Sequence, residues 1–149
     1  MGRLKDRYLE EGLDTYLKRL KQFGKVSLTR VREIPKKNPQ AEAAAKEKEA
    51  EKILAICKPG DRLVALTEEG KLHDSVQWAK MMEKMVNSTT GKIVFAIGSG
   101  PGLSETVKKQ ADHLVSLSPL TFPHQLALLL LLEQLYRGAT ILQGSPYHK

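Results

Sequence analysis

The segment IVFAIGSGPGLSE, residues 93–105, decides how the rest of this sequence is interpreted. It begins with a continuous apolar run, residues 93–97, that is typical of a strand buried on both faces. The turn Gly98-Ser99-Gly100-Pro101-Gly102 follows, and Ser104 then suits the N-cap of a helix. Glycines let a backbone approach a ligand closely. The segment predicts either a ligand-binding turn or a purely structural one, and the residues themselves favour neither.

The glycine spacing does not match two common phosphate-binding motifs. In the dinucleotide fingerprint the third glycine follows the second by three residues, whereas Gly102 follows Gly100 by two. A P-loop requires Gly-Lys-Ser/Thr, and Leu103 stands after Gly102. We therefore expect neither motif to operate here. A ligand, if bound, would lie at the carboxyl end of the strand, where open α/β sheets bind their ligands.

Helices and strands alternate on both sides of this segment. Helices are expected at about 5–23, 41–57, 75–86, 105–112 and after Pro123, and strands at 25–34, 62–66, 92–97, 113–118 and 139–142. Residues 35–40 are expected to form a loop and residues 67–71 a turn, and Asp74 is an expected N-cap. Continuous apolar strands between helices predict an α/β fold, a parallel sheet covered by helices on both faces. Without a repeat or linker, residues 1–149 are expected to form a single domain.

Positive charge is concentrated near the N-terminus. Residues 1–37 hold eleven Lys or Arg against five Asp or Glu, whereas the remainder holds thirteen against twelve. A basic first third suggests a surface that faces a polyanion, although a solvated lysine-rich helix explains it equally well. Aromatic residues make up only 5%, which argues against a base-stacking platform for single-stranded nucleic acid.

The sequence does not indicate a membrane-spanning, secreted or disulfide-bonded protein. The apolar run Leu126–Leu132 is far shorter than the roughly 20 residues that cross a bilayer, and no signal segment opens the chain. These features predict a cytoplasmic protein without a membrane segment. The single cysteine, Cys57, excludes an internal disulfide and a cysteine metal cluster, and we expect it to be buried.

Four motifs in the second half of the chain together resemble one family. They are IGSGPGL (97–103), SLSPLTFPHQL (116–126), LLEQLYRG (131–138) and the terminal PYHK (146–149). In this order they resemble the bacterial RlmH family, the ribosomal RNA large subunit methyltransferases H. These are small members of the SPOUT, or trefoil-knotted, methyltransferases. The resemblance extends from about Arg3 to Lys149, and so covers nearly the whole chain.

The resemblance implies a single SPOUT-type methyltransferase domain over residues 1–149, with a C-terminal trefoil knot. It implies S-adenosylmethionine as the cofactor and methyl donor. The acceptor would be the ring nitrogen 3 of a pseudouridine in 23S (large-subunit) rRNA of the assembled ribosome. The partners would be this rRNA and a second copy of the chain in a homodimer, with no membrane and no metal.

Site residues follow from the positions that match the family's motifs. The resemblance implies that donor-binding residues come from three segments of the chain: Leu66, Gly98, Ser99, Leu117, Ser118, Pro119, Leu120, Thr121, Phe122 and Pro123. It also implies a set of catalytic residues at the substrate end: His124, Arg137, Tyr147 and His148.

Each implied catalytic side chain suits one part of a methyl transfer to an imide-like N–H. His148 or His124 would assist removal of the proton. Arg137 would stabilise negative charge or hold a phosphate, and Tyr147 would stack on or hydrogen-bond the base. A histidine at a chain end is otherwise usually a surface residue, and an arginine near a helix C-terminus is often only a dipole partner.

The resemblance also interprets the leucine run. A helix that is apolar all round must be buried on all sides. In the family this helix passes through the knot and packs on its dimer mate, so Leu126–Leu132 would be core and dimer interface together. An ordinary core helix explains these leucines equally well.

The sequence departs from the family at three places. Met1-Gly2 stands where the family has a hydrophobic strand before the segment GRLKDRY, Leu128 stands where it generally has an arginine, and the order of GSGPGL is unusual. Two alternative functions therefore stay open. One is a non-catalytic ribosome-binding or assembly protein that keeps the fold, and the other is the same chemistry on another RNA such as tRNA.

Overall fold

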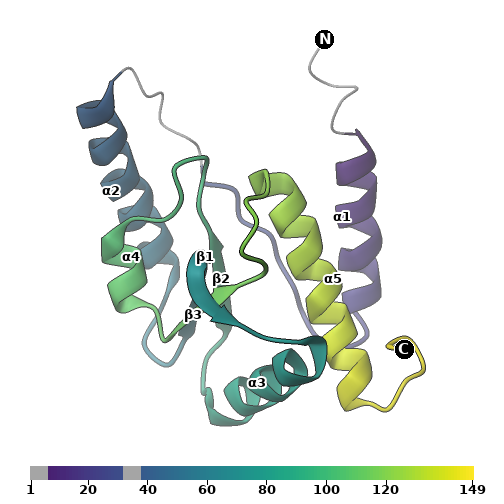
Figure 1. Ribbon diagram of the computed structural model, residues 1–149. Helices are drawn as coiled ribbons and strands as arrows, with labels where there is room; N and C mark the ends of the chain where they lie inside the picture. The colour runs from purple at the N-terminus through teal and green to yellow at the C-terminus, as the bar shows by residue number, and fades with distance from the viewer. Residues whose placement is uncertain (1–6, 32–37) are drawn as a thin grey trace.

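A three-stranded parallel sheet lies at the centre of the computed structural model, which describes residues 7–31 and 38–149. Five helices surround the sheet in the described part of the chain (Figure 1). The elements in chain order are α1 (Arg7–Leu20), α2 (Pro39–Ile56), β1 (Arg62–Leu72), α3 (Ser75–Ser88), β2 (Ile93–Ile97), α4 (Glu105–Gln110), β3 (His113–Ser116) and α5 (His124–Leu142).

The strand order is β2-β1-β3, so β1 is central. Its residues Arg62 to Leu66 pair in parallel with Ile93 to Ile97 of β2. On its other side, Val64 pairs with His113 and Leu66 with Val115. All three strands therefore end at one edge of the sheet.

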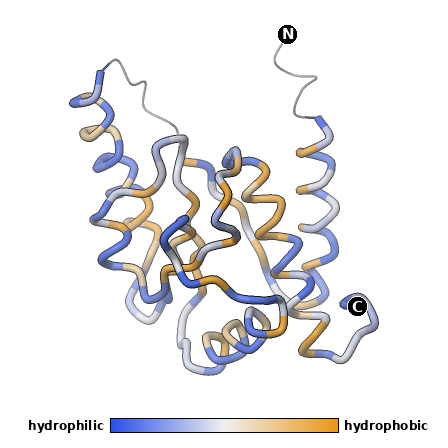
Figure 2. Tube along the Cα trace, in the orientation of Figure 1, coloured by the Kyte–Doolittle hydropathy of each residue, from blue (hydrophilic) through white to orange (hydrophobic). Residues whose placement is uncertain are grey.

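Alternate residues of β1 pack on opposite faces of the sheet. Leu63 and Ala65 belong to a core shared with α2 and α4, whereas Val64 belongs to a larger core shared with α1, α3 and α5. Figure 2 shows hydrophobic colouring along the strands and α5. Burial on both faces confirms the predicted α/β class, while the knot stays a prediction of the resemblance.

Three helices begin with a side-chain cap. Asn38 Oδ1 accepts from the N–H of Ala41 at 2.7 Å, and Ser104 Oγ accepts from the N–H of Val107 at 3.3 Å. Asp74 and Gln77 form a reciprocal capping box, with distances of 2.7 and 3.0 Å. The predicted caps at Asp74 and Ser104 are confirmed, and they fix where α3 and α4 leave the sheet.

Replacing Asp74 by alanine should lower the free energy of unfolding by about 1 kcal/mol, because the first turn of α3 loses its acceptor. Asp14→Ala, the same change on the exposed surface of α1, is the matched control. Urea denaturation of both variants measures the difference. Equal stability of the two would show that the capping box contributes nothing.

Two predicted strands are wrong. Residues 25–31 form no strand, and Val26 and Leu28 are 40% and 39% exposed; residues 32–34 of that prediction lie outside the described residues. Residues 139–142 continue α5, where Thr140 is 2% exposed and its Oγ1 donates to the carbonyl of Arg137. In both segments the β-branched residues suggest a strand, but no neighbouring strand pairs with them.

The predicted turn at residues 67–71 is instead a bulge within β1. Both Leu66 and Lys71 pair with Val115, so residues 67–70 leave the ladder between two paired positions. A Cβ on Gly70 would lie 2.4 Å from the carbonyl carbon of Val115, which explains why a glycine stands there. The bulge thus projects from the edge at which the strands end.

Candidate active site

A cavity of about 400 Å³ lies at the carboxyl ends of the strands. Leu66 of β1, Ile97 at the end of β2 and Leu117 just after β3 all line it. This volume falls within the range of roughly 300–1,000 Å³ found for small-molecule sites. The cavity therefore occupies the position at which open parallel sheets bind ligands.

The cavity brings together nearly all of the predicted donor-binding residues. Every one of them except Pro119 lines its wall, and so does one predicted catalytic residue, His124. Residues from the bulge of β1 and from α4 complete the wall: Thr67, Glu68, Glu69 and Lys108. The sequence did not single out these four.

The glycine turn forms one wall and has a structural reason for its first glycine. A Cβ on Gly98 would lie 2.4 Å from the carbonyl carbon of Gly102 and 2.5 Å from the nitrogen of Leu103. Gly102 adopts a φ of +79°, which favours glycine. Ser99 Oγ donates to Glu49 Oε2 on α2 at 3.0 Å, so the Ser99 hydroxyl is directed toward α2. The proton of the Ser99 hydroxyl is therefore directed away from the cavity, toward Glu49.

The loop between β3 and α5 also lines the cavity and is held by short-range hydrogen bonds. Ser116 Oγ donates to the carbonyl of Ser118 at 2.9 Å, and Ser118 Oγ accepts from the N–H of Leu120 at 3.0 Å. Thr121 Oγ1 donates to Glu68 Oε1 at 2.6 Å. These bonds fix the backbone of the loop, which is the condition for recognition of a planar ring by backbone groups.

Charged groups from the β1 bulge and α4 meet beside this cavity. Lys108 Nζ forms ion pairs with Glu69 and with Glu105, the latter at 3.1 Å. The hydrogen bond from Lys108 lowers the pKa of Glu69, and the same bond raises the pKa of Lys108. Both side chains therefore stay charged over a wide range of pH.

The other predicted catalytic residues form a cluster near the end of α5, and Glu133 connects them. Arg137 donates to Glu133 Oε1 from Nε at 2.9 Å and from Nη2 at 2.5 Å. Tyr147 Oη donates to the same oxygen at 3.2 Å, and Gln134 donates to Oε2 at 2.7 Å. The guanidinium of Arg137 also lies 4.8 Å from the centre of the Tyr147 ring.

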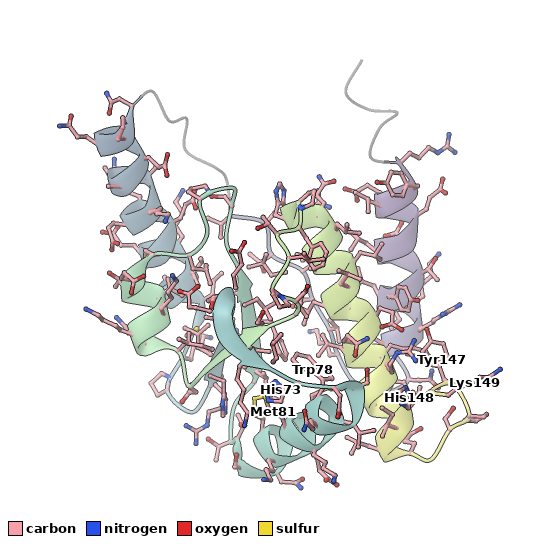
Figure 3. All side chains as sticks on the ribbon, in the orientation of Figure 1. His73, Trp78, Met81, Tyr147, His148 and Lys149 are labelled. Carbon is pink, nitrogen blue, oxygen red and sulfur yellow. The ribbon has the colours of Figure 1, made fainter. Side chains whose placement is uncertain are left out.

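His148 joins this cluster through Arg137, whose Nη1 lies 3.3 Å from His148 Nδ1. A guanidinium can only donate, so Nδ1 accepts, and a neutral His148 carries its proton on Nε2. Figure 3 shows Tyr147 and His148 together beside α5. Tyr147 Oη also lies 3.3 Å from Tyr16 Oη, which connects the C-terminal residues to α1.

Burial, the hydrogen bond with Tyr16 and the negative charge of Glu133 together raise the pKa of Tyr147 to about 12, and burial contributes most. The hydrogen bond with Glu133 raises the pKa of Arg137. At neutral pH Tyr147 is therefore a protonated phenol, able to donate a hydrogen bond but not to act as a base.

Titration of tyrosinate absorbance should show one of the four tyrosines ionising near pH 12, and Tyr147→Phe should remove that step. The folded chain holds this proton more tightly than the unfolded chain, whose tyrosine ionises near pH 10. The stability contributed by Tyr147 is therefore complete below about pH 10 and is lost as pH rises through about 12. A titration in which Tyr147→Phe changes only a step near pH 10 would contradict the raised pKa.

The four predicted catalytic residues thus lie in two separate groups within one chain. His124 lines the donor cavity at the start of α5, whereas Arg137 follows thirteen positions later, or roughly 20 Å along the helix. A second pocket, lined by His148 and His73, shares Leu117 and Phe122 with the donor cavity. These two shared residues form the connection between the groups.

Residues 7–31 and 38–149 contain neither a candidate membrane span nor a candidate metal site. No helix there has the length and apolar character needed to span a bilayer. No three His, Cys, Asp or Glu side chains in that part of the chain are grouped so that they could hold a metal ion.

Comparison with known proteins identifies the family. Residues 1–148 match the family described as "Predicted SPOUT methyltransferase". Among curated proteins, the chain is 45% identical to ribosomal RNA large subunit methyltransferase H of Pelotomaculum thermopropionicum, over 99% of this chain and 94% of that protein. It is 43% identical to the proteins of the same name from Alkaliphilus oremlandii and Streptococcus thermophilus, over 100% of this chain and 96% of each. The chain therefore belongs to the SPOUT methyltransferases and, within them, to the RlmH family.

Proposed function

We propose that this chain is an S-adenosylmethionine-dependent methyltransferase that modifies nitrogen 3 of a pseudouridine in large-subunit rRNA. The observation that carries the proposal is the cavity at the strand ends, which gathers nine of the ten residues expected to bind the donor. The relatives' shared name, which specifies large-subunit rRNA, supports the class of substrate.

The cavity suits the donor in size and in chemistry. Leu66, Leu120 and Phe122 offer apolar cover for an adenine ring, and the fixed backbone of residues 117–123 offers hydrogen-bonding groups at its edge. When bound, S-adenosylmethionine supplies a methyl group activated by a sulfonium. The protein's part is to hold donor and acceptor in line and to exclude water.

Removal of the acceptor proton has two candidate bases, and their contacts differ. His148 Nδ1 accepts from Arg137, so His148 must release that bond before Nδ1 can take a proton. His124 is exposed and lines the donor cavity. The structure therefore favours His124 as the base. His148 would use Nε2–H to donate to a ring carbonyl, and Arg137 would stabilise the negative charge that develops on the ring.

The surface of α1 supports a polyanionic substrate. Lys18, Arg19, Lys21 and Lys25 are exposed at the end of α1 and just after it. Neutralising RNA phosphates with such residues makes binding depend strongly on salt. The site of action would be the cytoplasm, where assembled ribosomes lie.

The leucine run supports a homodimer. Leu131, Leu132 and Leu135 are buried in the single chain, whereas residues 126–130 are only half-buried. Leucines at these positions would gain further burial against a second copy of the chain. We therefore propose that the outer side of α5 takes part in the dimer contact.

Labelled methyl transfer to ribosomes that lack the modification tests the proposal directly, with the modified nucleotide mapped afterwards. Label at nitrogen 3 of a pseudouridine in large-subunit rRNA is the expected result. Label at a different nucleotide would overturn the proposed acceptor, and absence of label would overturn the proposed reaction.

One observation favours a second candidate, a non-catalytic ribosome-binding protein. Leu128 packs against the core formed by α1, α3 and α5, at the position where the family generally has a charged arginine. Calorimetry with S-adenosylmethionine separates the two functions. Binding without any methyl transfer, or no binding at all, would favour the second candidate.

A further inference from the structure

In the described part of the chain, the Glu and Lys side chains that line the donor cavity come from two elements. Glu68 and Glu69 lie in the bulge of β1, and Lys108 lies on α4. Most of the other residues that line the cavity are apolar or glycine, and they include the glycine turn and most of the 117–123 loop. The carboxylates and the ammonium that line the cavity are therefore grouped where the bulge of β1 meets α4.

The bulge holds these charges in place by contacts on two sides. Glu68 accepts from Thr121 at 2.6 Å, which joins the bulge to the 117–123 loop. Glu69 pairs with Lys108, which joins the bulge to α4. Gly70 lies so close to the backbone of Val115 that an added Cβ would be 2.4 Å from its carbonyl carbon, so the bulge packs against β3.

We propose that Lys108 and Glu68 form a subsite for the amino-acid end of the methyl donor, with Lys108 binding the α-carboxylate and Glu68 binding the α-ammonium. This inference rests on the proposed function, because it assigns the amino-acid end of S-adenosylmethionine to one part of its cavity. The adenine end then lies toward the 117–123 loop.

Both side chains have hydrogen-bonding capacity left for a ligand. A lysine ammonium has three donors, and Lys108 directs two of them at Glu69 and Glu105. Thr121 occupies Oε1 of Glu68, and Oε2 can accept from an ammonium. The Lys108 side chain is only 19% exposed, so a carboxylate bound there is partly shielded from water and interacts more strongly than at an open surface.

Three ligands test the subsite by calorimetry: S-adenosylmethionine, S-adenosylhomocysteine and 5′-methylthioadenosine. The second keeps the zwitterionic end but lacks the sulfonium charge, and the third lacks the amino-acid end altogether. The wild type should bind S-adenosylhomocysteine about tenfold or more tightly than 5′-methylthioadenosine. Lys108→Met should lower the affinity for S-adenosylhomocysteine about tenfold and leave the affinity for 5′-methylthioadenosine unchanged.

Three further variants sharpen the result. Lys108→Arg should keep most of the affinity for S-adenosylhomocysteine. Glu68→Gln should lower the affinity for S-adenosylhomocysteine but not that for 5′-methylthioadenosine. Lys109→Met, the same change at the exposed neighbour outside the cavity wall, should bind all three ligands like the wild type.

Two outcomes would overturn the subsite while the proposed function stands. One is wild-type affinity of Lys108→Met for S-adenosylhomocysteine. The other is an equal loss for both nucleosides, which would mean that the substitution only disturbs the cavity wall. A wild type that binds none of the three ligands would instead overturn the proposed function and the subsite together.

Discussion

Replacing Gly98 by alanine should weaken the binding of S-adenosylmethionine by about 10- to 100-fold, the largest loss that we expect from a single methyl group. The added Cβ would lie 2.4 Å from the carbonyl carbon of Gly102 and 2.5 Å from the nitrogen of Leu103. Both atoms belong to the backbone, so the turn itself must open. Because this turn forms one wall of the donor cavity, the cavity changes shape with it.

Gly100→Ala is the matched control for this prediction. A Cβ at Gly100 would meet nothing within 4 Å, although Gly100 belongs to the same turn and lines the same cavity. Calorimetry should therefore give Gly100→Ala a donor affinity close to that of the wild type. Equal affinities for the two alanine variants would show that the turn tolerates opening and does not shape the site.

The sequence predicted the strands that pair and the helices that cover them. Residues 63–66 and 93–97 are continuous apolar runs because β1 and β2 are buried on both faces, so the composition of each run indicates its place in the sheet. The caps at Asp74 and Ser104 are local interactions over three residues, and such contacts are visible in a sequence.

The wrong secondary-structure predictions lie where contacts with another helix or strand decide the structure. Val26 and Leu28 have the composition of a strand but no ladder, and they remain partly exposed. Thr140 follows Gly138, whose missing side chain brings α5 close to Met82 and Trp78 of α3. This tertiary packing outweighs the lower helix propensity of Gly138, Thr140 and Ile141.

The sequence predicted the site residues that belong to short motifs. It did not predict residues that reach the site through contacts between distant parts of the chain. The 117–123 loop was found because its residues are consecutive. Glu68 and Lys108 were missed, since their contacts join residues 53 and 39 positions apart. Glu133 was missed for a different reason: its pairing with Arg137 at i,i+4 is an ordinary feature of helix surfaces. Only the fold shows that Tyr147 meets the same carboxylate.

Replacing Glu133 by glutamine should lower kcat/KM for methyl transfer by about 100-fold while the affinity for S-adenosylmethionine stays unchanged. One oxygen of Glu133 accepts from both Arg137 and Tyr147, and Arg137 in turn contacts His148. Glutamine keeps the size of the side chain but loses the charge that holds Arg137 and one of the two acceptor oxygens. Glu133 lines neither the donor cavity nor the second pocket, so donor binding should not depend on it.

The tyrosine titration distinguishes this positioning role from a general loss of stability. Because the negative charge of Glu133 helps to raise the pKa of Tyr147, Glu133→Gln should lower that pKa, while burial and Tyr16 keep it above its ordinary value. Glu51→Gln, on the exposed surface of α2, should change neither the titration nor the turnover. If Glu133→Gln lowers the pKa of Tyr147 but methylates ribosomes at the wild-type rate, the arrangement of this cluster has no part in the reaction. If turnover falls and the pKa does not move, Glu133 acts on the substrate directly rather than through Tyr147.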